Sequence, residues 1–292
     1  MSSAPMSASS ASAGSAAPEG LARSGVGQRV LKVEGVSLSL GGQKVLDGCD
    51  FEVFDRIRPG LTTGQVVALL GPSGVGKTRL LRIIAGLDAP DAGRVLGMGD
   101  VSLEAGRVGV VFQDYPLLKH RTVQGNLEIA GITNGLSAAD ARRRSKELLE
   151  RFRLADRARH FPAQLSGGQR QRVAIAQQLV VPKHLLLMDE PFSGLDPRAL
   201  DEVAELLVEV AHMDELNTII LVTHDVHAAM VVSDTLLMLG RVHGPEGKLI
   251  PGASIQASYD LVAKNLAWSK GIDETPEFAV LEREVRGLFK TL

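Results

Sequence analysis

An eight-residue stretch rich in glycine, residues 71–78, carries side chains suited to phosphate chemistry. It follows the pattern G-x-x-x-x-G-K-[ST] of a phosphate-binding loop. Because glycine lacks a Cβ atom, the backbone can curl around a phosphate and point its N–H groups inward. The ammonium of Lys77 can reach the β- and γ-phosphates of a nucleotide, and the hydroxyl of Thr78 can ligate Mg²⁺. The predicted phosphate-contacting residues are Gly71, Pro72, Ser73, Gly74, Val75, Gly76, Lys77 and Thr78.

The two flanks of this loop must hold it in place. Residues 66–70 are all apolar, which is the pattern of a strand buried on both faces of a parallel sheet. Residues 78–85 fit a helix, and Gly86 suits its C-terminal cap. The N-terminus of that helix adds roughly half a positive charge beside the phosphate. A glycine-rich turn without a ligand is the alternative, but the strand and the helix both favour the phosphate loop.

Three more apolar stretches, residues 108–112, 185–188 and 218–223, are predicted to be buried strands. Polar residues follow each of them: Gln113, then Asp189 and Glu190, then His224. In an open parallel sheet, ligands bind at the carboxyl ends of the strands. Any one of these residues alone also fits an ordinary loop or turn. Their shared position favours convergence on the phosphate loop.

A second glycine-rich helix start lies at residues 165–169, with the sequence LSGGQ. Ser166 and Gln169 have the spacing of a capping box, so Ser166 is predicted to cap a helix over residues 169–179. Gly167 and Gly168 permit close approach to the backbone, which suits an anion, but the turn has no lysine. An ordinary capped helix explains these residues equally well.

Length and composition narrow the class of protein. The 292 residues allow one large domain or two small ones, and 45% hydrophobic residues can bury a substantial core. A net charge of −2 gives no reason to expect nucleic-acid binding, and Arg142, Arg143 and Arg144 are predicted to form a solvated helix face. Cys49 is the only cysteine, so no intrachain disulfide is possible. We expect a small buried side chain there, in a reducing cytoplasm.

The N-terminal part of the chain predicts a tail and a small antiparallel sheet. Residues 1–29 are rich in Ser and Ala and are expected to be disordered, and no apolar run is long enough to span a membrane. Residues 31–36, 44–46 and 49–53 read as strands, with Gly41 and Gly42 in a hairpin turn. Residues 54–63 are predicted to form a loop or an extended hairpin.

The rest of the chain predicts further helices and strands. Ser137 is expected to cap a helix with an apolar stripe at Leu148, Leu149 and Phe152. One more strand is predicted at residues 235–239 and a short edge strand at 248–250. Two C-terminal helices are predicted at residues 259–268 and 276–289. The apolar face expected to pack the second helix on the chain's own core comprises Phe278, Val280, Leu281, Val285 and Leu288.

In order and spacing, these motifs resemble the nucleotide-binding subunit of ABC transporters over roughly residues 30–250. Residues 71–78 match the Walker A loop, 165–169 the signature and 185–190 the Walker B strand with its glutamate. Gln113 matches the Q-loop, residues 193–196 the D-loop, and His224 the switch histidine. The resemblance implies an α/β fold: a P-loop NTPase core with a mainly parallel sheet, an N-terminal antiparallel β subdomain and a helical signature subdomain. The expected domains are a tail at 1–29, an ATP-binding domain at 30–250 with its helical part at about 114–180, and a helical extension at 251–292.

The resemblance also implies roles for the site residues. Two subunits would sandwich two ATP molecules head to tail, so that a monomer hydrolyses ATP poorly. Ser166, Gly167, Gly168, Gln169 and Asp196 would then face the nucleotide held by Lys77 of the other subunit. Thr78, Gln113 and Asp189 would hold Mg²⁺. Glu190 would act as the general base, and His224 would contact the γ-phosphate.

The sequence departs from the family pattern at three places. Leu40 stands where family members usually carry an aromatic residue that stacks on adenine. Arg79 replaces a small hydroxyl residue, and residues 54–63 are longer than usual.

By resemblance, the chain is an ATP-hydrolysing subunit that powers a membrane transporter, on the layout of a bacterial small-solute importer. The expected cofactors are ATP and Mg²⁺. The expected partners are a second ATP-binding subunit in a homodimer, a separate transmembrane permease, and a substrate-binding protein. Tyr115, Leu117 and Leu118 are candidate permease contacts, at the cytoplasmic face of the inner membrane.

The sequence is also consistent with other substrates and other classes of ATPase. Residues 112–118 resemble nitrate, sulfonate and taurine uptake systems, and amino-acid uptake systems are nearly as similar. A soluble ABC ATPase acting on ribosomes or DNA is the main alternative. A phosphate-loop kinase or GTPase is disfavoured by the signature residues and by the lack of an Asn-Lys-x-Asp motif.

Overall fold

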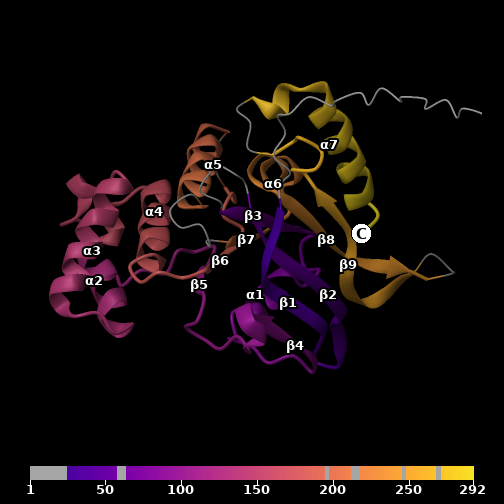
Figure 1. Ribbon diagram of the computed structural model, residues 1–292, viewed down its shortest axis with the longest axis horizontal. Coiled ribbons are helices and arrows are strands. Elements are labelled where there is room, and N and C mark those ends of the chain that lie inside the picture. The colour runs from indigo at the N-terminus through magenta and orange to yellow at the C-terminus, as the bar shows by residue number, and fades with distance from the viewer. Residues whose placement is uncertain (1–24, 58–63, 195–196, 212–217, 245–247, 268–270) are drawn as a thin grey trace, which may run out of the picture.

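A single mixed sheet with helices on both faces organises the chain (Figure 1). The computed structural model describes residues 25–57, 64–194, 197–211, 218–244, 248–267 and 271–292. The strands are β1 (Gly25–Leu40), β2 (Gln43–Ile57), β3 (Gln65–Leu70), β4 (Ala92–Gly97), β5 (Gly109–Val111), β6 (Leu185–Asp189), β7 (Thr218–Thr223), β8 (Thr235–His243) and β9 (Leu249–Asp260). The α-helices are α1 (Lys77–Ile84), α2 (Val123–Thr133), α3 (Ala138–Arg151), α4 (Gly167–Gln178), α5 (Pro197–Ala211), α6 (Val226–Val232) and α7 (Pro276–Phe289).

The central strands run parallel and are buried on both faces. The order across the sheet is β4-β1-β2-β9-β8-β3-β7-β6-β5, and β8, β3, β7, β6 and β5 are mutually parallel. Alternate residues of β3 enter two different cores. Val66, Ala68 and Leu70 face a core that includes α4 to α7, whereas Val67 and Leu69 face one that includes α1, β1 and β2. Cover on both faces explains the unbroken apolar run of this strand.

The N-terminal strands form the predicted antiparallel part of the sheet. β1 and β2 pair through a hairpin in which Gly41 and Gly42 take φ values of +56° and +78°, so the predicted glycine turn is confirmed. β2 meets β9 where Leu46 pairs with Ala253, which joins the antiparallel strands to the central ones. Cys49 is fully buried, donates to the Ala253 carbonyl at 3.3 Å, and has its pKa raised to about 12 by burial. The predicted fold class is confirmed.

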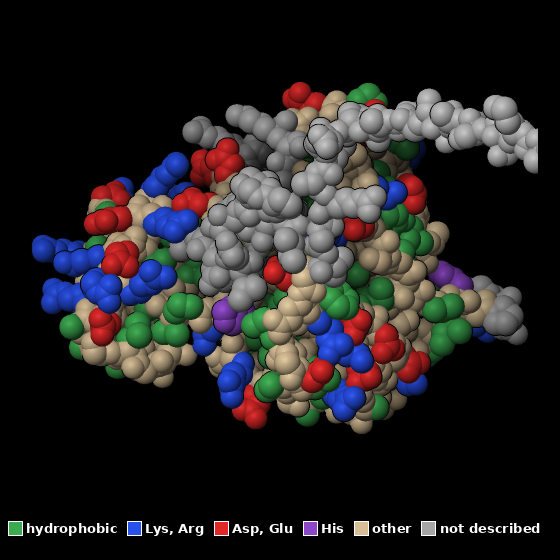
Figure 2. Space-filling view, viewed as in Figure 1, with side chains coloured by type: hydrophobic (Ala, Val, Ile, Leu, Met, Phe, Trp, Pro, Cys, Tyr) green, Lys and Arg blue, Asp and Glu red, His purple; other side chains and the backbone are tan. Residues whose placement is uncertain are grey.

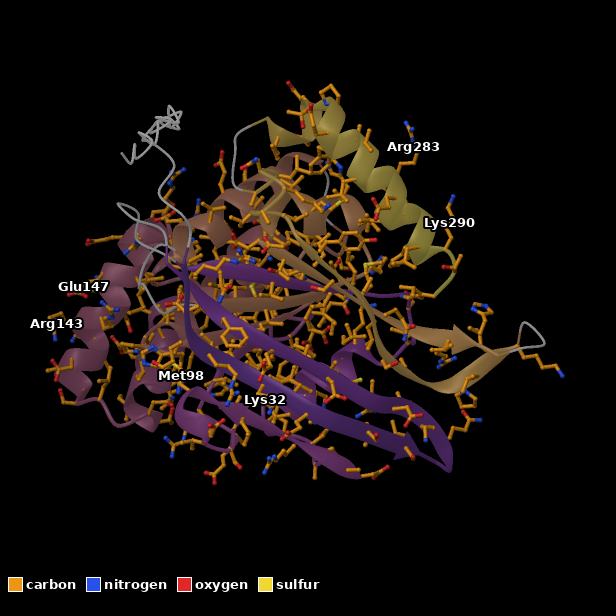
Figure 3. All side chains as sticks on the ribbon, turned by 45° about the vertical axis from the view of Figure 1, so that its right-hand side comes forward. Lys32, Met98, Arg143, Glu147, Arg283 and Lys290 are labelled. Carbon is orange, nitrogen blue, oxygen red and sulfur yellow. The ribbon has the colours of Figure 1, made fainter. Side chains whose placement is uncertain are left out.

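Helices α2, α3 and α4 lie beside the sheet edge that ends in β5 (Figure 1). Ser137 accepts a hydrogen bond from the Asp140 N–H and caps α3, as predicted. Leu148 and Leu149 are buried, whereas Arg143 is exposed and pairs with acidic neighbours. Figure 3 shows Arg143 and Glu147 directed away from the molecule, and Figure 2 shows both charge signs intermingled on this end. The arginine run is therefore a solvated, ion-paired helix face.

The C-terminal prediction was partly wrong. β9 is a twelve-residue strand that pairs antiparallel with β8 through Asp260, so a short edge strand and a helix from residue 259 are both incorrect. Pro251 and Gly252 lie inside this strand, although both residue types are uncommon in strand interiors. In the structure Gly252 takes φ +94° beside an irregularity in the register with β8. The predicted domain boundary at residue 250 therefore falls inside a strand of the main sheet.

Other element boundaries also differ from the predicted ones. β1 begins at Gly25, five residues before the predicted start of order, and the rest of the predicted tail lies outside the described residues. Residues 54–57 extend β2 and pair with β1, which agrees with the extended-hairpin alternative and not with a loop; residues 58–63 are not among those described. The helix predicted at 276–289 is confirmed as α7, with Phe278 and Val285 buried; Val280 is 64% exposed and does not belong to its packed face. None of the described helices is both long and apolar enough to cross a bilayer.

Candidate active site

The loop between β3 and α1 has the backbone geometry that its glycines predict. Gly74 and Gly76 take φ values of +78° and +116°, which other residues rarely adopt. A Cβ atom on Gly71 would lie 2.5 Å from the carbonyl oxygen of Leu239 in β8, so close packing excludes a side chain there. Helix α1 begins after Gly76 without a side-chain cap and without an acidic residue in its first turn. Its N-terminus is therefore suited to an anion.

The neighbouring hairpin forms a wall of the loop. A Cβ atom on Gly76 would come within 3.1 Å of Val45 Cγ1 and 2.9 Å of Leu46 Cδ2 in β2. Leu40 ends the paired strand β1 and is 42% exposed. Val45 was predicted to lie in a strand, but its place beside the phosphate loop was not predicted, because nothing in its local pattern reveals contact with a loop some 30 residues away. Within the loop, Val75 is buried while Ser73 is exposed.

Lys77 is 6% exposed and is surrounded by oxygen atoms. Its Nζ donates to the carbonyls of Gly71 at 2.8 Å and Pro72 at 3.2 Å, and lies 3.3 Å from Glu190 Oε1. A buried ammonium needs such partners, since an unpaired charge in the interior is very costly. Phosphate oxygens could take the place of these carbonyl and carboxylate oxygens without moving the lysine out of the loop.

Thr78 and Asp189 form the oxygen-rich side of the site. The Thr78 hydroxyl donates to Asp189 Oδ1 at 3.2 Å across the loop and the end of β6. Burial raises the pKa of Asp189, and the adjacent Glu190 carboxylate raises it further. A cation beside Asp189 would lower the pKa of this carboxyl again, because a positive charge favours the ionised carboxylate. A hydroxyl and a carboxylate are ligands that Mg²⁺ accepts together with phosphate oxygens.

Across the described part of the chain, no group of three or more His, Cys, Asp or Glu residues could hold a metal ion. A divalent cation held by Asp189 would thus find its further ligands in Thr and Gln side chains and in nucleotide oxygens. Gln113, which follows β5, lines one hollow together with Phe112, Asp114 and Asp189. Its Nε2 donates to Ser193 Oγ at 3.1 Å. The structure thus places Gln113 on the same side of the site as Asp189.

Glu190 links the lysine to the histidine. Its Oε1 faces Lys77, while its Oε2 lies 2.9 Å from His224 Nδ1 and accepts from the His224 backbone N–H at 3.3 Å. Glu190 has φ +47°, an uncommon value for a residue other than glycine that often marks functional sites. Its own N–H donates to the Val222 carbonyl at 2.9 Å, which holds it at the end of β7. The ends of β3, β6 and β7 therefore bring these three side chains together, as predicted.

The LSGGQ turn is well formed. The Ser166 hydroxyl accepts from the Gln169 N–H at 3.2 Å, and Gln169 Oε1 accepts from the Ser166 N–H at 2.9 Å, so the predicted capping box is confirmed. Ser166 and Gly167 are exposed. A Cβ atom on Gly167 or Gly168 would meet no atom within 4 Å, so the fold of the described chain does not require glycine at either position. Asp196 lies outside the described residues.

Two residues that the sequence did not single out for this role connect the signature helix and the segment after Gln113 to the site. Gln171 of α4 is fully buried and donates to the Pro191 carbonyl at 2.9 Å. The Tyr115 hydroxyl donates to the same carbonyl at 3.4 Å, and burial raises the pKa of that hydroxyl to about 12. Pro191 follows Glu190 directly. Only the buried position of the polar Gln171 side chain marks this link, and burial is invisible in the local pattern.

The fold and this site define a phosphate-loop nucleotide-binding protein of the α/β class. Residues 54–193 match the family described as ABC transporter. Residues 162–229 also match a family described as AAA domain, putative AbiEii toxin, Type IV TA system. The chain contains an ABC transporter ATP-binding cassette, as the motifs predict.

Curated relatives carry the same cassette. The sulfate/thiosulfate import ATP-binding protein CysA of Gloeobacter violaceus is 43% identical over 196 residues, covering 66% of this chain and 57% of that protein. CysA of Thermosynechococcus vestitus is 40% identical over 215 residues, covering 72% and 61%. CysA of Pseudomonas aeruginosa is 44% identical over 202 residues, covering 65% and 60%. The chain thus spans about three fifths of the length of these relatives.

Solved structures agree with the fold. The cbiO1 structure from Clostridium perfringens, part of the ABC transporter complex cbiONQ, has a TM-score of 0.67 and 26% identity, covering 88% of this chain and 99% of that one. The dimeric ATP-binding cassette MJ0796 in a post-hydrolysis state bound to ADP and Pi has a TM-score of 0.62 and 27% identity, covering 79% and 98%.

Proposed function

We propose that this chain is the ATP-binding and ATP-hydrolysing subunit of an ABC membrane transporter that imports a small solute. One observation carries the proposal: Lys77, Glu190 and His224 meet at the carboxyl ends of parallel strands, beside the Thr78–Asp189 pair. Phosphoryl transfer asks mainly for positioning and for neutralisation of charge, and this constellation supplies both. The relatives are import ATP-binding proteins, which supports the direction of transport.

Each residue then has a role that follows from its chemistry. Lys77 exchanges its loop carbonyl partners for β- and γ-phosphate oxygens. Thr78, Gln113 and Asp189 hold Mg²⁺, which neutralises phosphate charge when it is bound. Glu190 accepts a proton from, or orients, the attacking water. His224, held by the Glu190 carboxylate at 2.9 Å, contacts the γ-phosphate.

The signature turn acts on the nucleotide of a second subunit in our proposal. The described fold of the chain itself does not require glycine at positions 167 and 168, since a side chain at either would enter open space. Glycine there makes sense if another surface approaches the backbone closely. A head-to-tail homodimer would bring Ser166, Gln169 and Asp196 to the triphosphate on the partner's Lys77. The dimeric MJ0796 structure supports this arrangement.

The same proposal assigns the membrane partner to the surface near Gln113. A groove beside this segment is lined by Pro116 and Leu118 and by residues of α2 and α4. Leu118 is 40% exposed, and Tyr115 from the same segment reaches the carbonyl that follows Glu190. Together with Leu117, these residues form the proposed contact for a separate permease, at the cytoplasmic face of the inner membrane. A substrate-binding protein would deliver the solute to that permease.

Purification from membranes tests the transport function. We expect the tagged full-length chain, expressed with its neighbouring genes, to retain an integral membrane subunit in mild detergent. A Leu118→Asp variant should lose that subunit while keeping ATP binding, and Leu87→Asp, at another exposed leucine, is the matched control. Recovery with ribosomes or DNA, and never with a membrane subunit, would instead establish the soluble ATPase alternative.

Leu40 provides a test of where the base lies. Replacing Leu40 with Tyr restores an aromatic face at the end of the hairpin that packs against the loop. We expect ATP to bind a few-fold more tightly, because an aromatic side chain that stacks on a base contributes about 1–3 kcal/mol when fully engaged. Titration with ATP and with inorganic triphosphate separates base binding from phosphate binding. Equal affinities for wild type and variant would place the base away from Leu40.

A further inference from the structure

The C-terminal helix α7 packs against α6, the short helix that follows His224 (Figure 1). Asp225 caps α6 by accepting from the Ala228 N–H at 3.1 Å, so His224 stands immediately before the cap. α6 has only seven residues, and isolated helices shorter than about 12 residues are marginal in water. Its geometry therefore depends on what packs against it.

His227 in the first turn of α6 is the point where α7 makes contact. Its ring meets the ring of Phe278 edge to face, with centroids 5.7 Å apart and planes at 76°. Its Nδ1 lies 3.3 Å from Glu282 Oε1. Phe278 and Glu282 are four residues apart on α7 and so share one helix face. Phe278 is fully buried, whereas Arg283 and Lys290 point outward from α7 (Figure 3).

The end of the chain is attached to the sheet at a second place. The Leu292 carbonyl accepts from the Arg241 N–H at 3.3 Å, and a Cβ atom on Gly240 would lie 2.5 Å from Leu292 Cδ2. Gly240 follows Leu239, whose carbonyl packs on Gly71 of the phosphate loop. α7 is thus held at both ends of its path, by Phe278 near its start and by Leu292 just beyond its end. A helix fixed in this way can hold α6 in turn.

We propose that His227, Phe278 and Glu282 are positioning residues that act through His224. By clamping the first turn of α6, they restrict His224 to positions where it meets Glu190 and the terminal phosphate. This role presupposes the ATP hydrolysis proposed above. Misplacing a reactive group by about 1 Å can cost up to about 100-fold in rate. The contacts described for these three residues join α6 to α7 and do not involve the phosphate loop, so we expect the clamp to change turnover rather than nucleotide affinity.

Steady-state ATP hydrolysis by the full-length chain tests this role. We expect Phe278→Leu, which keeps the apolar core, and Glu282→Ala each to lower kcat about tenfold with little change in KM. Glu282→Gln should restore part of the loss because its amide oxygen can still face His227. The matched controls are Val280→Ala, on the outer side of α7, and Arg286→Gln, which removes the other partner of Glu282 and leaves His227 in place. Thermal melting shows whether each variant is folded.

A double-mutant cycle distinguishes positioning from general loss of structure. If the clamp acts through His224, Phe278→Leu and Glu282→Ala should have no further effect on kcat once His224 is replaced by Ala. An equal fall in kcat in both backgrounds would overturn the proposal, and so would a higher KM with an unchanged kcat. In that event the proposed ATPase function would still stand, provided that the wild-type chain hydrolyses ATP and that replacing Glu190 abolishes the hydrolysis. A wild-type chain that hydrolyses no ATP would defeat the proposed function itself.

Discussion

Replacing Glu190 with glutamine should lower the rate of ATP hydrolysis at least about 100-fold while ATP binding is kept. The amide has nearly the size and shape of the carboxylate and keeps one acceptor oxygen, but its NH₂ group only donates, and the amide cannot take a proton from water. It also removes a negative charge 3.3 Å from Lys77, which frees that ammonium for phosphate oxygens. Single-turnover hydrolysis and equilibrium binding of ATP, measured on the same preparation, separate the two effects.

The same variant tests the head-to-tail arrangement. With hydrolysis blocked, ATP should hold two chains together, so size-exclusion chromatography with ATP should show a dimer that dissociates when the nucleotide is removed. Glu147→Gln is the matched control, because Glu147 is exposed on α3, where its described ion pairs are with Arg143 and Arg144. It should hydrolyse ATP normally and show no trapped dimer. A Glu190→Gln chain that stays monomeric with ATP and turns over at the wild-type rate would falsify both the catalytic role and the sandwich.

Replacing Lys77 with alanine should weaken ATP binding about 30-fold or more. Removing one member of a buried, hydrogen-bonded charge pair costs about 2–5 kcal/mol. Lys77 is 6% exposed, so solvent cannot replace its charge when the triphosphate is bound. Titration of a fluorescent ATP analogue, with ADP as competitor, measures the loss. Adenosine, which has no phosphate, should bind the variant and the wild type alike.

Two further variants show whether the loss reflects the phosphate or the fold. Lys146→Ala removes an exposed lysine from α3 and should leave the affinity unchanged. Lys77→Ala also leaves Glu190 without its cation, so a melting curve must accompany the titration. In the Lys77→Ala/Glu190→Gln double variant the stranded charge is gone, and affinity should stay low. Wild-type affinity in a folded Lys77→Ala chain would show that the triphosphate lies elsewhere.

Much of the fold followed from local patterns in the sequence. The apolar run at residues 66–70 predicts a strand covered on both faces, and the structure covers it on both. Ser166 and Gln169 stand three residues apart, the spacing at which each side chain reaches the other's backbone. The glycines and Lys77 of the phosphate loop lie within eight residues. In each case the interacting groups are neighbours along the chain, so sequence alone determined the element and its place.

Only the tertiary structure decided which distant groups touch. The bridge from Lys77 through Glu190 to His224 spans 147 positions in the sequence, and its distances depend on how β3, β6 and β7 align. Gln171 reaching Pro191 and Phe278 covering His227 likewise depend on the packing of whole helices. β9 was predicted wrongly because residues 249–260 form a strand by pairing with β8, and that partner is not visible in the local sequence. Such contacts follow from burial and register, and no short window of residues contains that information.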